Sequence, residues 1–131
     1  MAPTYPKHKA VLKWAEGELG THEEPLGSNT GERVRFYQRH TWLGGTGWPW
    51  CAAFVDTAWE VGGKNPLPWK SAGAWDIGNR GRAAGWAVTT PTHLTPGDIV
   101  TFKAGAGHVA LFVSYDPKTG FLHWVKVASP R

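Results

Sequence analysis

The chain has 131 residues, nine tryptophans and a formal net charge of +4 at pH 7. This length predicts a single domain, residues 1–131, with a core of its own. A hydrophobic fraction of 41% excludes a disordered chain, and no apolar run approaches the roughly 18 residues that a membrane span needs. The opening MAPTYPKHKAVLKW lacks the apolar segment of a signal peptide. We therefore expect synthesis in the cytoplasm without a signal peptide, and no membrane insertion.

The first half of the chain has the periodicity of helices. Apolar residues recur at helical spacing in four segments separated by loops that are rich in glycine and proline. Gly20 is a natural stop for the first helix, and Ser71 is a plausible N-cap for the fourth. The predicted helices are residues 7–19, 32–40, 51–61 and 71–81.

The second half has the pattern of strands. Alternating and β-branched segments are separated by turn signals, including the sequence DPKTG at residues 116–120. The predicted strands are residues 85–90, 99–102, 107–115 and 121–129. Helices followed by an antiparallel sheet indicate an α+β fold, with the N-terminal helices packed on the C-terminal sheet.

Two residues of this predicted fold are candidates for catalysis. Cys51, the only cysteine, opens the third helix, and His108 opens a strand directly after the sequence KAGAG. A helix start favours a thiolate, a neighbouring imidazole can accept the thiol proton, and backbone N–H groups near Cys51 can hold an oxyanion. The alternative is a buried structural cysteine and a surface or capping histidine. A single cysteine excludes both an internal disulfide and a multi-cysteine zinc site.

The sequence blocks WCAAFV, TPGDIVTF and GHVALFVSY resemble the signature blocks of the CHAP and NlpC-type papain-like peptidases and amidases. The resemblance extends over most of the chain, from the first predicted helix to the last predicted strand. It implies a papain-like fold and cleavage of peptide or amide bonds in bacterial peptidoglycan. In such a site Cys51 is the nucleophile and His108 is the base, and the reaction needs no metal or other cofactor.

The resemblance also nominates a third catalytic residue. The sequence FLHW resembles a block that carries the orienting histidine in NlpC-type members, which points to His123. CHAP members usually have Asn or Glu slightly later, where residues 126–128 carry neither. A hairpin that turns at DPKTG places His123 opposite about Phe112, roughly 13 Å from His108 along the strand. A β-bulge, a different register, or a Cys–His pair without a third side chain are the alternatives.

Four residues are predicted to contact substrate. The segment ELGTHEEPLGSNTGERVRFY resembles the opening of phage-type members and nominates Glu24 and Asn29, although an ordinary polar loop with Asn29 as a helix cap explains it equally well. Trp48 and Trp50 flank the thiol and are predicted to supply an aromatic wall. The remaining histidines lack such context and are interpreted as surface residues: His8, His22, His40 and His93.

The sequence therefore predicts a monomeric cysteine hydrolase of phage-lysin type that acts on peptidoglycan. The bond cleaved is either one within the peptide, by an endopeptidase, or the one cut by an N-acetylmuramoyl-L-alanine amidase. A catalytically silent cell-wall-binding module of the same fold and an interbacterial amidase toxin are the alternatives. The positive charge suits a polyanion or an ordinary solvated surface, and no nucleic-acid-binding motif accompanies it, so no nucleic-acid partner is expected.

Overall fold

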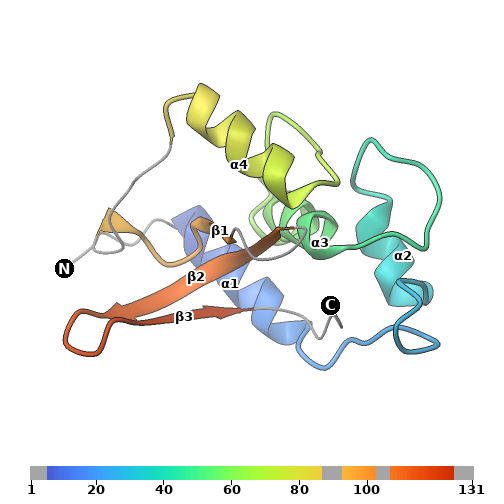
Figure 1. Ribbon diagram of the computed structural model, residues 1–131, viewed down its shortest axis with the longest axis horizontal. Helices are drawn as coiled ribbons and strands as arrows, with labels where there is room; N and C mark the ends of the chain where they lie inside the picture. Colours follow the sequence, from blue (N-terminus) through green and yellow to red (C-terminus); the bar gives the residue numbers. More distant parts are fainter. Residues whose placement is uncertain (1–5, 87–92, 103–106, 126–131) are drawn as a thin grey trace.

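A computed structural model describes residues 6–86, 93–102 and 107–125. Over these ranges the chain forms helices packed beside a three-stranded antiparallel sheet, which confirms the predicted α+β class (Figure 1). Within them, every helix is too short or too polar to cross a membrane. The helices are α1 (Pro6–Gly17), α2 (Glu32–Gln38), α3 (Cys51–Thr57), its π-helical continuation η1 (Ala58–Gly62), and α4 (Ala74–Ala83).

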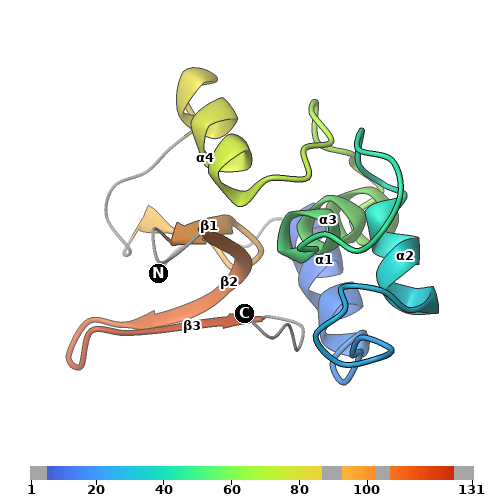
Figure 2. The same cartoon turned by 45° about the vertical axis from the view of Figure 1, so that its right-hand side comes forward.

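The sheet contains β1 (Ile99–Phe102), β2 (His108–Asp116) and β3 (Phe121–Val125), in that order. β1 pairs with the first half of β2, and the predicted turn at residues 116–120 joins β2 to β3. The register between β2 and β3 shifts between Phe112 and Ser114. The hairpin of β2 and β3 extends away from the helices, whereas β2 begins on the side of the sheet nearest α3 (Figures 1 and 2). The strand predicted at 85–90 falls mostly outside the described residues.

The core surrounds α3, which packs against β2 of the sheet and against α2, while α1 packs against η1. Six consecutive residues of α3, from Ala52 to Thr57, are buried, so this helix is covered all round. Val109 and Leu111 of β2 join the same cluster from the sheet side. The helices contribute these buried side chains: Val11, Ala15, Val34, Tyr37, Ala52, Ala53, Phe54 and Val55.

Two glycines, the last residue of η1 and the one that follows it, let α1 approach closely. A Cβ atom at Gly62 would lie 2.5 Å from Cβ of Trp14, and one at Gly63 would lie 2.6 Å from Cγ2 of Val11. Both distances are shorter than van der Waals contact allows. The sequence GG at the end of the third predicted helix is therefore a packing requirement as well as a stop signal.

His8 is a structural residue, contrary to the prediction that it lies on the surface. Its Nε2 lies 2.9 Å from Oδ1 of Asp98, and its ring meets Trp59 edge-on with centroids 4.9 Å apart. Gly97 packs so closely that a Cβ there would lie 2.7 Å from the carbonyl oxygen of His8. These contacts fix α1 to the turn before β1. A pattern of polar residues on a helix cannot reveal a partner 90 residues away.

Two other local predictions are corrected. His40 is half-buried and its Nδ1 lies 2.8 Å from the carbonyl oxygen of Phe36, whereas His22 and His93 are exposed as expected. α4 begins after Gly73 without a side-chain cap. The Ser71 hydroxyl instead accepts a hydrogen bond from the Gly73 N–H at 3.1 Å, so it stabilises the turn that leads into the helix.

Candidate active site

Cys51 is the first residue of α3 and carries a free, half-buried thiol. The preceding carbonyl, that of Trp50, accepts a hydrogen bond from the Phe54 N–H at 2.9 Å and closes the first turn of the helix. Pro49 stands just before this turn, and its fixed φ angle limits the backbone conformations of the segment that leads into the helix. The prediction that a helix begins at the cysteine is therefore confirmed.

His108 is the first residue of β2 and lies directly opposite Phe102 of β1. The two rings are nearly parallel, at 27°, with centroids 6.0 Å apart. The residue before it, Gly107, has φ +90°, and a Cβ there would lie 2.7 Å from Cδ1 of the Trp75 indole. Only glycine fits this position, because it tolerates the left-handed backbone and leaves room for Trp75.

The elements that carry the two residues are neighbours. α3 packs against β2, and β2 begins at the end that is nearest to α3 (Figure 2). Val109, which follows His108, lies in the same apolar cluster as the residues that follow Cys51. The fold thus brings together the start of a helix and the start of a strand that are 57 positions apart in the sequence.

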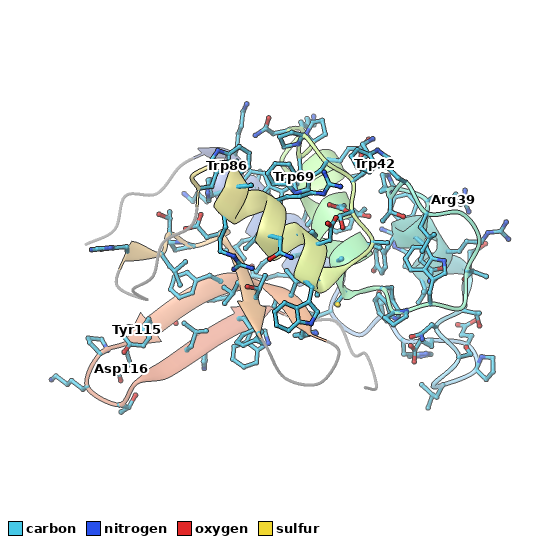
Figure 3. The ribbon with its side chains drawn as sticks, turned by 45° about the horizontal axis from the view of Figure 1, so that its top comes forward. Arg39, Trp42, Trp69, Trp86, Tyr115 and Asp116 are labelled. Carbon is cyan, nitrogen blue, oxygen red and sulfur yellow. The ribbon has the colours of Figure 1, made fainter. Side chains whose placement is uncertain are left out.

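His123 occupies a different part of the sheet. The observed register pairs it with Ser114, and Trp124 takes the place opposite Phe112 that was expected for it. Ser114 lies six positions beyond His108 on β2, which is roughly 20 Å along an extended strand. Ser114 stands just before Tyr115, and Figure 3 shows Tyr115 beside the hairpin tip, away from the helices. Residues 126–128, the other positions considered, lie outside the described residues.

Trp50 is a core residue and not a wall of a substrate groove. Its side chain is fully buried, so it has no surface to offer to a ligand. The indole stacks on Tyr37 with ring centroids 5.5 Å apart, and its Nε1–H donates to Oε2 of Glu23 at 2.9 Å. Proximity to the thiol in the sequence predicted a cleft position, but the residue before the helix points inward.

The other three predicted contact residues lie in loops beside α2 and α3. Trp48 is half-buried, with its Nε1–H donating to the Gly44 carbonyl at 3.1 Å. Glu24 is exposed, and its backbone N–H and carbonyl bond to Thr30. Asn29 adopts φ 56° and precedes α2 by two residues, so it does not cap that helix, whose N-cap is Gly31.

Aromatic residues that sequence reasoning did not assign to the site lie around His108. Trp75 is 42% exposed and covers Gly107, and Trp124 is 37% exposed with its ring 4.8 Å from that of Phe102. A shallow hollow beside them, between α4 and β1, is lined by Ala74, Trp75, Gly78, Arg82, Thr101 and Phe102. The sequence offered one clue to Trp75: it lies on a short predicted helix, and packing does not account for an exposed tryptophan there.

A comparison with known protein families matches residues 43–128 to the CHAP domain. The chain belongs to the CHAP family. The matched range contains both Cys51 and His108, and it leaves α1 and α2 outside. No curated protein and no solved structure matches the chain. Membership of the CHAP family points to a function of the peptidoglycan hydrolase type.

This CHAP domain also has an aromatic surface beside α4, formed by the exposed Trp42 and Trp86 and the half-buried Trp69. Trp86 and Trp69 lie side by side with ring centroids 5.0 Å apart, and Trp42 lies farther along the same side of the molecule (Figure 3). The Arg80 guanidinium sits 5.4 Å from the centroid of the Trp42 ring. Exposed apolar patches of this kind commonly mark binding surfaces in soluble domains.

A buried carboxyl group lies on the helix that carries the thiol. Asp56 is 2% exposed, and among the described residues neither of its oxygens has a hydrogen-bond partner. Burial raises the pKa of Asp56 to about 8, with Lys70 opposing and Glu60 adding to the shift. No group of three potential metal ligands gathers in the part of the CHAP domain that the structure describes. Asp56 is therefore a group whose charge costs stability.

Proposed function

We propose that this CHAP domain is a papain-like cysteine hydrolase that cleaves a peptide or amide bond in peptidoglycan. Cys51 is the nucleophile and His108 is the general base. The observation that carries the proposal is the packing of α3 against β2, because these two elements begin with Cys51 and His108. The family match supports it, since residues 43–128 include both residues and the contact between the two elements.

The chemistry follows from these two groups. His108 takes the thiol proton while Cys51 Sγ attacks the carbonyl carbon, and the resulting oxyanion is held by backbone N–H groups at the start of α3. His108 then gives the proton to the leaving amine, and the C–N bond breaks to leave a thioester. Water, deprotonated by His108, attacks the thioester and releases the acid and the free thiol. No cofactor takes part.

The proposed centre is a Cys–His pair, with the imidazole oriented by its surroundings. Phe102 packs against the ring of His108, and Trp75 fixes the backbone just before it. His123 is too distant along β2 to hydrogen-bond directly to His108. We therefore place His123 outside the catalytic group.

Substrate contacts are proposed on both sides of the pair. Trp75 and the hollow beside it flank His108, while Trp48 and the exposed Glu24 belong to the loops around α2 and the start of α3. The aromatic surface of Trp42, Trp69 and Trp86 suits a polymer with apolar sugar faces. A lysin of phage type is the proposed setting, and an interbacterial amidase toxin would use the same bond chemistry.

Digestion of purified peptidoglycan, followed by mass spectrometry of the new termini, tests the proposal. New amino termini within the stem peptides identify an endopeptidase, whereas free lactyl groups together with L-alanine amines identify an amidase. EDTA is expected to leave the rate unchanged. Release of no product by folded protein would contradict hydrolysis and favour the silent cell-wall-binding module. Activity that is lost in EDTA and restored by calcium or zinc would contradict the cofactor-free mechanism.

A further inference from the structure

Glu23 is a carboxylate buried in the helical part of the molecule, and both of its oxygens are used. The residue is only 1% exposed. Oε2 accepts a hydrogen bond from Nε1–H of Trp50, and Oε1 accepts one from the backbone N–H of Gly27, both at 2.9 Å. A buried carboxylate with two donors is held in a single orientation, because rotation would leave an oxygen unpaired.

The partner of Glu23 is the residue directly before Cys51. Trp50 is the N-cap residue of α3, with φ −121° and ψ 15°, and no side chain caps the helix. A conventional side-chain cap stabilises the start of a helix and fixes its first turn. Here the first turn depends on the position of the Trp50 side chain, which Glu23 holds at one end and the Tyr37 ring supports across its face.

The support under Trp50 is itself fixed. The Tyr37 hydroxyl donates to Oε1 of Glu18 at 2.7 Å, and Arg33 pairs with the same carboxylate. Burial raises the pKa of Tyr37 to about 12, so the phenol keeps its proton and remains a donor at neutral pH. The ring on which Trp50 stacks therefore stays in one position.

A second set of bonds holds the segment that leads to Trp50. Nε2 of Gln38, which is fully buried, donates to the Trp48 carbonyl at 2.9 Å and to the Asn29 carbonyl at 3.2 Å. The Gly47 N–H donates to the same Asn29 carbonyl at 3.0 Å. The segment from Glu23 to Gln38 thus holds residues 47–50 from two sides, and all of it lies outside the matched range 43–128.

We propose that Glu23 is a positioning residue for the nucleophile: through Trp50 it sets the position of the Cys51 thiol. This inference rests on the proposed function, since it assigns to Glu23 a part in the same reaction. The Glu23 carboxylate bonds to the Trp50 indole and to the Gly27 N–H, so its effect on the thiol passes through the indole. Displacements of about 1 Å at a reacting atom cost up to about a hundredfold in rate, so a loosened first turn slows attack.

Three variants test the proposal on the whole chain. In Glu23→Gln the amide N–H₂ faces either the Trp50 Nε1–H or the Gly27 N–H, so one of these two donors loses its acceptor. Trp50→Phe keeps an aromatic ring on Tyr37 but removes the Nε1–H. The double variant removes both partners of the same bond. Thr57→Val is the matched control, because the Thr57 hydroxyl bonds to the carbonyls of Ala53 and Tyr37 at the far end of α3.

The readouts are the rate of Cys51 alkylation by iodoacetamide from pH 5 to 9, kcat and KM on peptidoglycan, and the unfolding temperature. We expect Glu23→Gln and Trp50→Phe each to lower kcat and the alkylation rate about tenfold, with KM within about twofold of the wild type. The double variant should lose no more than either single variant, because both act through one bond. Thr57→Val should lower the unfolding temperature without slowing alkylation.

Wild-type alkylation and turnover in both Glu23→Gln and Trp50→Phe would overturn the proposal. So would a tenfold loss in Thr57→Val, since the effect would then be one of general stability. If Glu23→Gln fails to fold, Trp50→Phe decides the question alone, because in that variant Glu23 is intact and an aromatic ring still stacks on Tyr37. Alkylation needs no peptidoglycan, so a wild-type protein that fails to hydrolyse peptidoglycan defeats the proposed function and still leaves the positioning effect measurable.

Discussion

The two candidate catalytic residues are supported in different ways. Cys51 follows a segment that is held by directional hydrogen bonds from buried polar side chains, chiefly Glu23 and Gln38. The described contacts beside His108 are aromatic: the face of Phe102 lies against its ring, and Trp75 fills the space over Gly107. The difference predicts that loss of a polar group will harm the nucleophile, whereas a change of side-chain volume will harm the base.

Removal of the imidazole should give the largest effect on the sheet side. His108→Ala deletes the group that accepts the thiol proton, and general base catalysis contributes about 10²–10⁴-fold. We expect kcat on peptidoglycan to fall by that factor and Cys51 alkylation near neutral pH to slow. Turnover of His108→Ala within about threefold of the wild type, measured as soluble muropeptide released per minute, would remove His108 from the mechanism.

A small change of volume beside the base should have an intermediate effect. In Gly107→Ala the new methyl group would lie 2.7 Å from Trp75, on a backbone with φ +90° that favours glycine. We expect a loss of about 1–3 kcal/mol in the free energy of unfolding and about a tenfold loss of kcat. Denaturant unfolding and steady-state kinetics measure the two quantities. If the double variant Gly107→Ala/Trp75→Ala is no better than Gly107→Ala, the clash with Trp75 is not the cause.

Asp56, on α3, allows a test of the free energy of unfolding that does not depend on catalysis. The folded-state pKa, about 8, lies above the value near 4 of an unfolded chain. The folded state therefore keeps a proton that the unfolded state has lost, and stability falls as pH rises from about 4 to 8, then levels off.

Asp56→Asn has no such proton and should escape this loss. We expect it to match the wild type near pH 4 and to unfold at a higher temperature at pH 8, as followed by circular dichroism. Asp98→Asn serves as the control, because Asp98 is paired with His8 and its neutralisation should lower the unfolding temperature. A wild-type protein that is as stable as Asp56→Asn at pH 8 would show that the carboxylate has a partner in solution.

The smallest effect is expected at the far end of the sheet. His123 pairs with Ser114, so His123→Ala should leave kcat within about threefold of the wild type. Its alkylation profile from pH 5 to 9 should overlay that of the wild type. A loss comparable to that of His108→Ala would mean that the hairpin register in solution brings the two histidines together.

Most helices and strands of this fold could be predicted from the sequence, because they depend on local hydrophobic periodicity and turn residues. The four helices, the strand that begins at His108 and the turn at residues 116–120 follow from periodicity and turn residues. The family resemblance on residues around Cys51 and His108 is confirmed by the matched CHAP domain.

What the sequence did not reveal depends on contacts between distant segments. Nothing local in the sequence shows that Glu23 is buried or that its partner is Trp50, 27 residues away. Trp50 was placed in the cleft because sequence neighbours of a nucleophile often line it, but a helix start can point such a neighbour inward. The shift between Phe112 and Ser114 moved His123 farther from His108, and no turn residue encodes that shift.

Release of soluble muropeptides by Cys51→Ser is the most direct test of the central claim. The hydroxyl nearly matches the thiol in size but ionises far less readily, so the fold should be kept while the chemistry is lost. With circular dichroism and unfolding temperature unchanged, we predict a rate at least about a thousandfold below that of the wild type. Release at a near wild-type rate by folded Cys51→Ser would contradict a cysteine mechanism in this CHAP domain.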